Sequence, residues 1–168
     1  CYATGVINYN DIEGIQQSSF GGLFGHSDNS EIYNSYSNAT VNGDSRVGGL
    51  IGLIEGDSIL ENCYSDGKVN GSEIVGGLIG QILSGPISIV ENCYSTGDVN
   101  GSSKVGGFAG ENKGSITNCY STGKVSSTSS LKGGFIGTNS GIVVNSYYNI
   151  ETSGQTDTGK GTPLTTQE

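Results

Sequence analysis

The sequence predicts an all-β protein, a right-handed parallel β-solenoid (β-helix) of about five to six coils with a period of about 28 residues. Three observations indicate this fold: a unit repeated along the chain, apolar residues at equivalent positions of each unit, and the composition. Glycine is the commonest of the 168 residues at 30, Pro occurs twice, and Met and Trp are absent. Abundant Val, Ile, Thr, Tyr, Ser and Asn are typical of short strands joined by tight turns.

The repeated unit has two recognisable halves. The first half reads GGLFG, GGLIG, GGLIG, GGFAG and GGFIG from Gly21, Gly48, Gly76, Gly106 and Gly133, at spacings of 27, 28, 30 and 27 residues. The second half reads Asn-Cys/Ser-Tyr-Ser, degraded in the last copy, and a further copy without its Asn opens at Cys1. Leucine-rich, helical and propeller repeats need other patterns or longer units. We therefore expect about three short strands per coil, with right-handed connections as parallel crossovers require.

Apolar residues recur at fixed places in the unit and form columns when the coils stack about 4.8 Å apart. Four columns are expected to make the core: Ile32, Leu60, Val90, Ile116 and Val143; Ile7, Val41, Val69, Val99 and Val125; Leu23, Leu50, Leu78, Phe108 and Phe135; Phe24, Ile51, Ile79, Ala109 and Ile136. Opposite charges fall on adjacent coils at Lys68, Asp98 and Lys124. Glu61 and Glu91 are instead neighbours of like charge.

An asparagine column is expected to be structural: Asn34, Asn62, Asn92, Asn118 and Asn145. Asn tolerates left-handed turns, and stacked amides hydrogen-bond along the axis. The Gly-Gly pairs suit a corner where a side chain would not fit or where φ is positive.

Cysteine occupies the next position, at Cys1, Cys63, Cys93 and Cys119, with Ser35 and Ser146 at the same place in other copies. A disulfide between adjacent coils has a suitable Cα spacing, but in-register Cβ atoms about 4.8 Å apart are too distant. Disulfides and simple packing of a small inward column are both open. Packing without bridges is the favoured interpretation.

Tyrosine follows, and these residues are the candidate surface ladder: Tyr36, Tyr64, Tyr94, Tyr120 and Tyr147, with Tyr2 in the same column. If residues 63–69 form one strand, Cys63 and Val69 face inward and Tyr64 faces outward. An outward ladder would offer an aromatic platform to a carbohydrate or another partner. A bend at Gly67 would instead place the rings in the core.

The five GGLxG copies, each followed by the N-C/S-Y-S segment, resemble the GLUG-motif repeat proteins, named for a Gly-Leu-any-Gly core. Two copies depart from Leu at Phe108 and Phe135, and the tail from Tyr147 is similar to endings seen in that family. The resemblance implies large prokaryotic cell-surface or secreted proteins, often adhesin-like and sometimes joined to domains such as peptidases. It carries no catalytic residues.

The composition disfavours several classes of function. A net charge of −9 with a single Arg argues against nucleic acid as a partner and against an anionic membrane surface, and no apolar run could insert into a bilayer. Glu61 and Glu91 are the best carboxylate pair for a carbohydrate-processing β-helix enzyme, an alternative that we disfavour. His26 is expected to be a solvated turn residue. No cofactor or metal is expected, and Asn38, Asn70 and Asn100 head glycosylation sequons.

We therefore expect residues 1–150 to form GLUG-type solenoid repeats and residues 151–168 a polar tail that could cap the stack. The expected function is a non-catalytic, structural or adhesive module at the extracellular or cell surface of a prokaryote. The alternative is a subunit of an extracellular filament joined end to end. The expected partners are other copies of the chain or the rest of a longer surface protein, with a carbohydrate or host surface as a further candidate.

Overall fold

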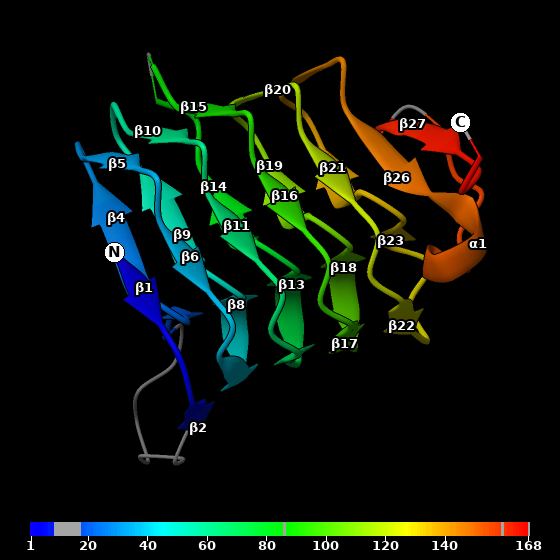
Figure 1. Ribbon diagram of the computed structural model, residues 1–168, viewed down its shortest axis with the longest axis horizontal. Coiled ribbons are helices and arrows are strands. Elements are labelled where there is room, and N and C mark those ends of the chain that lie inside the picture. The colour runs from blue at the N-terminus through cyan, green and yellow to red at the C-terminus, as the bar shows by residue number, and fades with distance from the viewer. Residues whose placement is uncertain (9–17, 86, 159, 168) are drawn as a thin grey trace.

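The computed structural model describes residues 1–8, 18–85, 87–158 and 160–167, which form a parallel β-solenoid whose coils follow one another from the N-terminal to the C-terminal end (Figure 1). Strands at equivalent places in successive coils pair into five parallel sheets, here named A to E. Sheet A has seven strands: β1 (Tyr2–Ala3), β6 (Tyr36–Ser37), β11 (Tyr64–Ser65), β16 (Tyr94–Ser95), β21 (Tyr120–Ser121), β26 (Tyr147–Asn149) and β27 (Thr162–Leu164).

The other four sheets have five strands each. Sheet B contains β2 (Val6–Asn8), β7 (Thr40–Asn42), β12 (Val69–Asn70), β17 (Val99–Gly101) and β22 (Val125–Ser127). Sheet C contains β3 (Phe20–Gly21), β8 (Ser45–Gly48), β13 (Glu73–Gly76), β18 (Ser103–Gly106) and β23 (Lys132–Gly133). Sheet D contains β4 (Phe24–Asp28), β9 (Ile51–Glu55), β14 (Ile79–Ile82), β19 (Ala109–Asn112) and β24 (Ile136–Asn139). Sheet E contains β5 (Glu31–Tyr33), β10 (Ile59–Glu61), β15 (Ile89–Glu91), β20 (Ser115–Thr117) and β25 (Ile142–Val144).

The solenoid and its period of about 28 residues are confirmed, but the expectation of three strands per coil is wrong. Five short strands make each coil, because the Gly-Gly corner separates sheet C from sheet D and another turn separates sheet A from sheet B. Strands as short as two residues show too little alternation to be counted from sequence.

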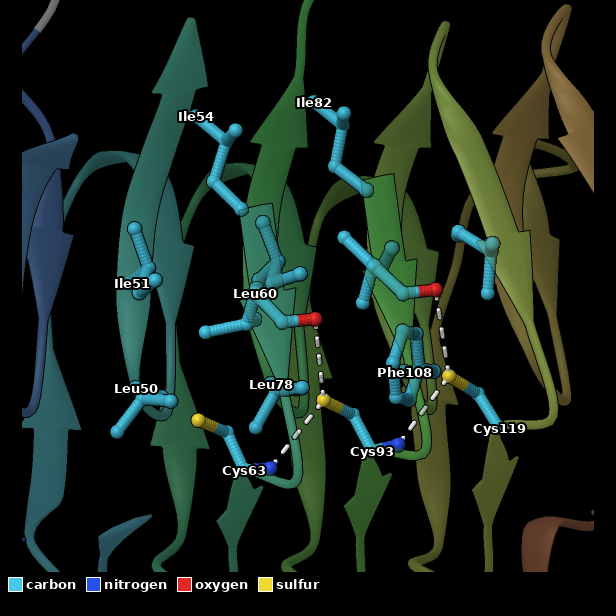
Figure 2. Packing of buried hydrophobic residues seen from close by; sticks show 14 of the residues in the cluster. Leu50, Ile51, Ile54, Leu60, Cys63, Leu78, Ile82, Cys93, Phe108 and Cys119 are labelled. Carbon is cyan, nitrogen blue, oxygen red and sulfur yellow. Dashed lines mark hydrogen bonds between the residues drawn. The ribbon is translucent and has the colours of Figure 1, made fainter. Parts of the chain in front are cut away.

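The strand pairing confirms the apolar columns: Leu60 lies between Ile32 and Val90, and Val69 lies between Val41 and Val99. The core has two parts. A larger cluster packs inward-facing residues of sheets A, D and E, together with the Leu50 to Phe135 column (Figure 2), and a smaller cluster consists almost entirely of valines from sheets B and C. The terminal coils are less covered.

Four residues that were expected in the core are not fully buried, because they lie in the terminal coils. Phe24 is 36% exposed, and Ile7, Leu23 and Val143 are only partly buried. These residues lie in β2, in β25, in β4 or directly before it. Among the described strands, β2, β4 and β25 each have a partner on one side. A residue of an apolar column is shielded from water only where a coil packs on each side of its own coil.

The Gly-Gly corners are set by close backbone approach and not by positive φ. A Cβ on Gly76 would lie 1.9 Å from the carbonyl oxygen of Ile79, and a Cβ on Gly49 would lie 2.1 Å from Ser65 Oγ. The last glycine of the motif has a similar role, since a Cβ on Gly80 would lie 2.6 Å from the carbonyl carbon of Arg46, which joins sheet D tightly to sheet C. Among the described glycines, positive φ occurs at positions outside the Gly-Gly pairs.

One residue in each of β8, β13 and β18 adopts a left-handed conformation: Arg46 (φ 47°), Ile74 (φ 49°) and Lys104 (φ 47°). The pairing register passes from Glu73 directly to Val75, so Ile74 is left out of the ladder. This conformation costs an L-residue roughly 1–2 kcal/mol, and the cost is expected to be higher for a β-branched residue such as Ile74. Contacts between sheets C and D must therefore compensate for it in these three coils.

The connections between sheets D and E vary in length while the sheets stay in register. Three residues separate β9 from β10, six separate β14 from β15, and two separate β19 from β20. The strands on either side remain paired, since Ile82 lies beside Ile54 and Ile89 beside Ile59. The unequal spacing of the repeats is thus absorbed mainly at this one corner.

The C-terminal segment lies against the last coil (Figure 1). Asn149 caps the short helix α1 (Ile150–Ser153), and β27 then extends sheet A beside β26. Asp157 accepts a hydrogen bond from the backbone N–H of Gly134 at 2.8 Å, and its carbonyl accepts one from the Tyr148 hydroxyl at 2.6 Å. Residues 159 and 168 of the polar tail lie outside the described residues. The rest of the segment pairs with backbone groups that the final coil would leave open.

Alkaline pH is expected to weaken this C-terminal packing. Burial and the nearby Asp157 raise the pKa of Tyr148 from 10.0 to about 12, so the folded state favours the neutral phenol. That contribution is complete below pH 10 and is lost as the pH rises through 12. Tyr148→Phe has neither the titrating hydroxyl group nor its hydrogen bond, so the variant should be less stable than wild type at pH 8. The difference in free energy of unfolding between the two proteins should become smaller towards pH 11.5. Urea unfolding at several pH values measures it, and a constant gap would contradict the expectation.

Candidate functional site

The tyrosine ladder consists of Tyr2, Tyr36, Tyr64, Tyr94 and Tyr120, one from each of the first five strands of sheet A. Cys63 and Ser65, on either side of Tyr64, are buried, so the tyrosines face outward, although residues 63–69 form two strands, β11 and β12, and not one. Ring centroids along the ladder are 5.4, 4.9, 4.8 and 5.0 Å apart, and the planes differ by at most 11°. The ladder is a continuous aromatic strip along the solenoid axis.

This stacking decides what the ladder can contact. Each inner ring has both faces against its neighbours, which leaves its edge and hydroxyl group to a partner. A sugar ring needs a free aromatic face and can find one only where the stack is interrupted. Tyr147 occupies the next place in the register beside Tyr120, yet among the described rings it makes no stacking contact.

Two hydroxyl groups of the ladder, those of Tyr64 and Tyr94, have a raised pKa. Burial raises the pKa of Tyr64, and the adjacent Tyr94 and Tyr36 raise it further. Burial also raises the pKa of Tyr94, followed by the effect of Tyr120 and Asp66. A stack of like phenols resists ionisation because each phenolate would lie beside another. Tyr64 and Tyr94 therefore present uncharged hydrogen-bonding groups on an acidic protein.

The five residues of the expected asparagine ladder all adopt left-handed backbone conformations: Asn34, Asn62, Asn92, Asn118 and Asn145, with φ between 45° and 55°. The Asn145 amide donates to Asn118 Oδ1, and the Asn118 amide donates to Asn92 Oδ1, each at 3.4 Å. This column lies beside the tyrosine ladder, because each Asn precedes its Tyr by two residues. Its side chains are exposed.

Glu61 and Glu91 are neighbours in sheet E, as expected. Glu61 accepts a hydrogen bond from the Asn62 amide at 3.2 Å, and Glu91 accepts one from the Asn118 amide at 3.4 Å. The amides of the asparagine ladder therefore offset the repulsion between these carboxylates. Asp98 accepts from the backbone N–H of Lys124 at 3.1 Å, and in the described part of the chain no ion pair joins it to either lysine.

The cysteine column links adjacent coils through its sulfur atoms. Cys63, Cys93 and Cys119 are buried free thiols, in line with packing without bridges. The backbone N–H of Cys63 donates to Cys93 Sγ at 3.3 Å, and that of Cys93 donates to Cys119 Sγ at 3.4 Å (Figure 2). Each thiol also donates to the carbonyl two residues before it, as in Cys93 to Glu91 at 3.1 Å.

The serines of the column act in the same way as the cysteines. The backbone N–H of Cys119 donates to Ser146 Oγ at 3.1 Å, and Ser146 Oγ donates to the carbonyl of Val144 at 2.8 Å. The preceding left-handed Asn turns this N–H inward along the axis, where a side-chain acceptor on the next coil must satisfy it. Sequence reasoning found the column but not this role. The alternation of Cys with Ser was the available signal, because both can donate and accept at the same place.

Removal of one acceptor from this column should destabilise the fold. We expect Cys93→Ala to cost about 1–3 kcal/mol, because the buried N–H of Cys63 loses its partner. Cys93→Ser keeps a donor and an acceptor and should cost less than half as much. Chemical unfolding followed by circular dichroism compares the two variants. Equal losses for Ala and Ser would indicate that the sulfur only fills space.

A second asparagine ladder, which sequence reasoning missed, runs along sheet B. The Asn42 amide donates to Asn8 Oδ1 at 2.8 Å, and the Asn70 amide donates to Asn42 Oδ1 at 2.7 Å. The nitrogen that a glycan would need on Asn70 is thus already engaged in this ladder. Asn38 and Asn100, the other two sequon residues, are exposed.

The remaining polar side chains of interest form ion pairs and hydrogen bonds along sheets C and D. His26 lies in strand β4 and not in a turn, which corrects the expectation, and its Nε2 is 3.2 Å from Glu55 with both side chains 49% exposed. Lys104 and Gln81 both contact Glu111. Within the described ranges, no His, Cys, Asp and Glu side chains gather in a group of three suited to a metal ion. None of the described helices has the length and apolar character needed to cross a membrane.

A family model for the GLUG motif matches residues 43–70, 71–100 and 101–126, three consecutive repeats that together make half of the chain. Each match starts at or directly after the last residue of a sheet B strand and ends within the sheet B strand one coil later, so one motif is one full coil. The chain matches none of the curated proteins and none of the solved structures compared with it. On its repeats and their coils, the chain belongs to the GLUG-motif family.

Proposed function

We propose that this chain is a non-catalytic structural module of a prokaryotic surface or secreted protein, in which a stiff solenoid presents an adhesive face. The GLUG coils and the solenoid fold support a structural module built from repeats. The adhesive role and the location outside the cell are the proposal. The tyrosine ladder is the observation that carries it.

The rigidity of the solenoid supports a role as a spacer. Five parallel sheets run along the axis and connect each coil to the next by backbone hydrogen bonds. Side-chain columns of Asn, Cys and Tyr add contacts in the same direction. A coil rises about 4.8 Å, so the described coils make a rod only about 25–30 Å long, suited to a part of a larger assembly.

The face presented by the ladder supports adhesion to a polar, uncharged surface. The ladder offers aromatic edges and hydroxyl groups in a row, while the chain carries a net charge of −9. Anionic surfaces would be repelled by that charge. Repetition of the same group at each coil also permits many weak contacts with a repeating polymer, whose combined strength exceeds that of one contact. A carbohydrate polymer of a host or matrix has this character.

Bead adhesion tests the proposal. Beads that carry the chain should bind films of neutral polysaccharide or cultured host cells better than bare beads do. Simultaneous Tyr36→Ala, Tyr64→Ala and Tyr94→Ala should reduce binding severalfold in a chain that keeps its β circular dichroism. Tyr33→Ala is the matched control, because Tyr33 is an exposed tyrosine on sheet E. Equal binding by the triple variant, or no binding by wild type, would reject adhesion through the ladder.

Filament assembly is a second candidate, favoured by the N-terminal coil. Strands β1 and β2 are edge strands of sheets A and B, each with a partner on one side among the described strands. Tyr2 is 66% exposed and Val6 is 63% exposed. Open parallel edges accept another chain, or a preceding coil of the same protein, by strand addition. Light scattering and electron microscopy at high concentration test this, and a strictly monomeric particle would remove the filament candidate.

A further inference from the structure

The tyrosine ladder ends at Tyr120, and its end differs from its interior. Tyr120 stacks on Tyr94 at 5.0 Å with an interplanar angle of 4°. On the other side the register places Tyr147, which makes no ring contact among the described residues. Tyr120 is 42% exposed, whereas Tyr64 and Tyr94 are half-buried. The ring of Tyr120 therefore has one face stacked and one face open.

An open groove of about 490 Å³ lies at this interruption. It is lined by Tyr120 and Tyr147 from sheet A, Asn118 and Asn145 from the asparagine ladder, and Cys119 at its base. The volume falls within the range of small-molecule sites. Two aromatic rings on adjacent strands and two amides beside them thus meet at one place on the surface.

The lining groups determine which chemistry the groove can bind. The Asn145 amide donates to Asn118 Oδ1, which leaves the Asn145 carbonyl oxygen as an acceptor for a ligand hydroxyl. The described residues that line the groove include no Lys or Arg, and Glu91 accepts a hydrogen bond from the Asn118 amide close by. An anionic ligand would meet no positive charge and would be repelled. A ring with an apolar face and several hydroxyl groups matches an open aromatic face beside amides.

We infer that this groove is a subsite for a neutral saccharide, whose pyranose ring stacks on the open face of Tyr120 and whose hydroxyl groups hydrogen-bond the Asn145 amide. This inference deepens the proposed adhesive function, on which it rests, by naming the ligand class and one place of contact. It also explains why an interrupted ladder serves recognition better than a complete one. A complete stack would have no free face at this position.

Saturation-transfer NMR on the whole chain tests the inference. The probes are methyl glycosides of glucose, galactose, mannose and N-acetylglucosamine, with methyl glucuronide as the anionic comparison. At least one neutral probe should receive saturation when the tyrosine rings are irradiated, and methyl glucuronide should receive less. Tyr120→Ala should weaken binding of that probe roughly tenfold, whereas Tyr120→Phe keeps the ring face and should retain binding within about threefold.

Tyr2→Ala is the matched control, because Tyr2 is the ladder ring at the other end and does not line the groove. Binding unchanged by Tyr120→Ala, weakened equally by Tyr2→Ala, or strongest for the anionic probe would overturn the saccharide subsite. Absence of saturation transfer to every probe would overturn it as well. If beads still adhered through the Tyr36, Tyr64 and Tyr94 face in that case, the proposed function would stand without this subsite.

Discussion

Substitution of Ile116 by Asp should abolish the folded state or drive the chain to aggregate. Ile116 is fully buried in the larger core cluster, between Val90 and Val143 in sheet E. A carboxylate there would have apolar neighbours on both adjacent coils, in a cluster of described residues that contains no Lys or Arg. Burial of an unpaired charge costs roughly 5 kcal/mol or more, which is comparable with the whole stability of a small domain.

Ile116→Val is the matched control, since other coils already use Val in this column, and it should cost only about 1 kcal/mol. Circular dichroism and size-exclusion chromatography of the two variants distinguish the outcomes. A soluble, fully β-structured Ile116→Asp chain would show that the column does not lie in the core.

Addition of a single methyl group at Gly76 should be nearly as damaging. The Cβ of Gly76→Ala would lie 1.9 Å from the carbonyl oxygen of Ile79 and 2.7 Å from the backbone nitrogen of Gly110. Both are backbone atoms of the corner and of the next coil, so neither can rotate away. We expect a loss of about 3 kcal/mol or more, because the corner must open and sheets C and D must separate.

Gly114→Ala offers a milder comparison in the same chain. Its Cβ would lie 2.9 Å from a side-chain methyl group of Ile82 and 2.9 Å from the Ser88 carbonyl oxygen, so its overlaps are milder than the 1.9 Å contact at Gly76. Thermal unfolding should therefore rank wild type above Gly114→Ala, and Gly114→Ala above Gly76→Ala. A Gly76→Ala chain as stable as Gly114→Ala would disprove the steric account of the Gly-Gly corner.

The core was predictable because self-alignment of the repeats sets the register of every strand at once. Once Leu60 and Val90 are matched as equivalent residues, stacking makes them neighbours whatever the local backbone does. The direction of Tyr64 was left open by the sequence, since a bend at Gly67 would have reversed it, and the burial of Cys63 and Ser65 on either side places it outward. Periodicity in a solenoid thus carries information on contacts that are about 28 residues apart in sequence.

Details within a coil were less predictable, because they depend on backbone geometry that composition does not encode. Ile74 at φ 49° breaks the usual preference of a β-branched residue, and only the close contact of sheets C and D accounts for it. The sulfur acceptors at Cys63 and Cys93 depend on the turn of the preceding Asn. The number of strands was underestimated for a similar reason.

The sequence indicates where the candidate site lies, but not how its side chains are arranged. The column that contains Tyr120 and Tyr147 is evident in the sequence, which indicates an aromatic row. Sequence gives both residues the same role, whereas the structure stacks one and not the other. The difference arises at the last coil, where β27 adds to the sheet beside Tyr147 and changes its surroundings. Such an end effect has no counterpart in a repeat.

The corner between sheets D and E tolerates two to six residues without disturbing the strands on either side. Loop closure costs rise only slowly with length, so longer inserts at this corner should be accommodated as well. The solenoid can therefore diversify or be engineered by grafting peptides there, one per coil. Such grafts would emerge in a line along the rod at about 4.8 Å intervals per coil. The chain can therefore serve as a scaffold for ordered display, because the corner of each repeat can vary in sequence while the strands of the same repeat maintain the fold.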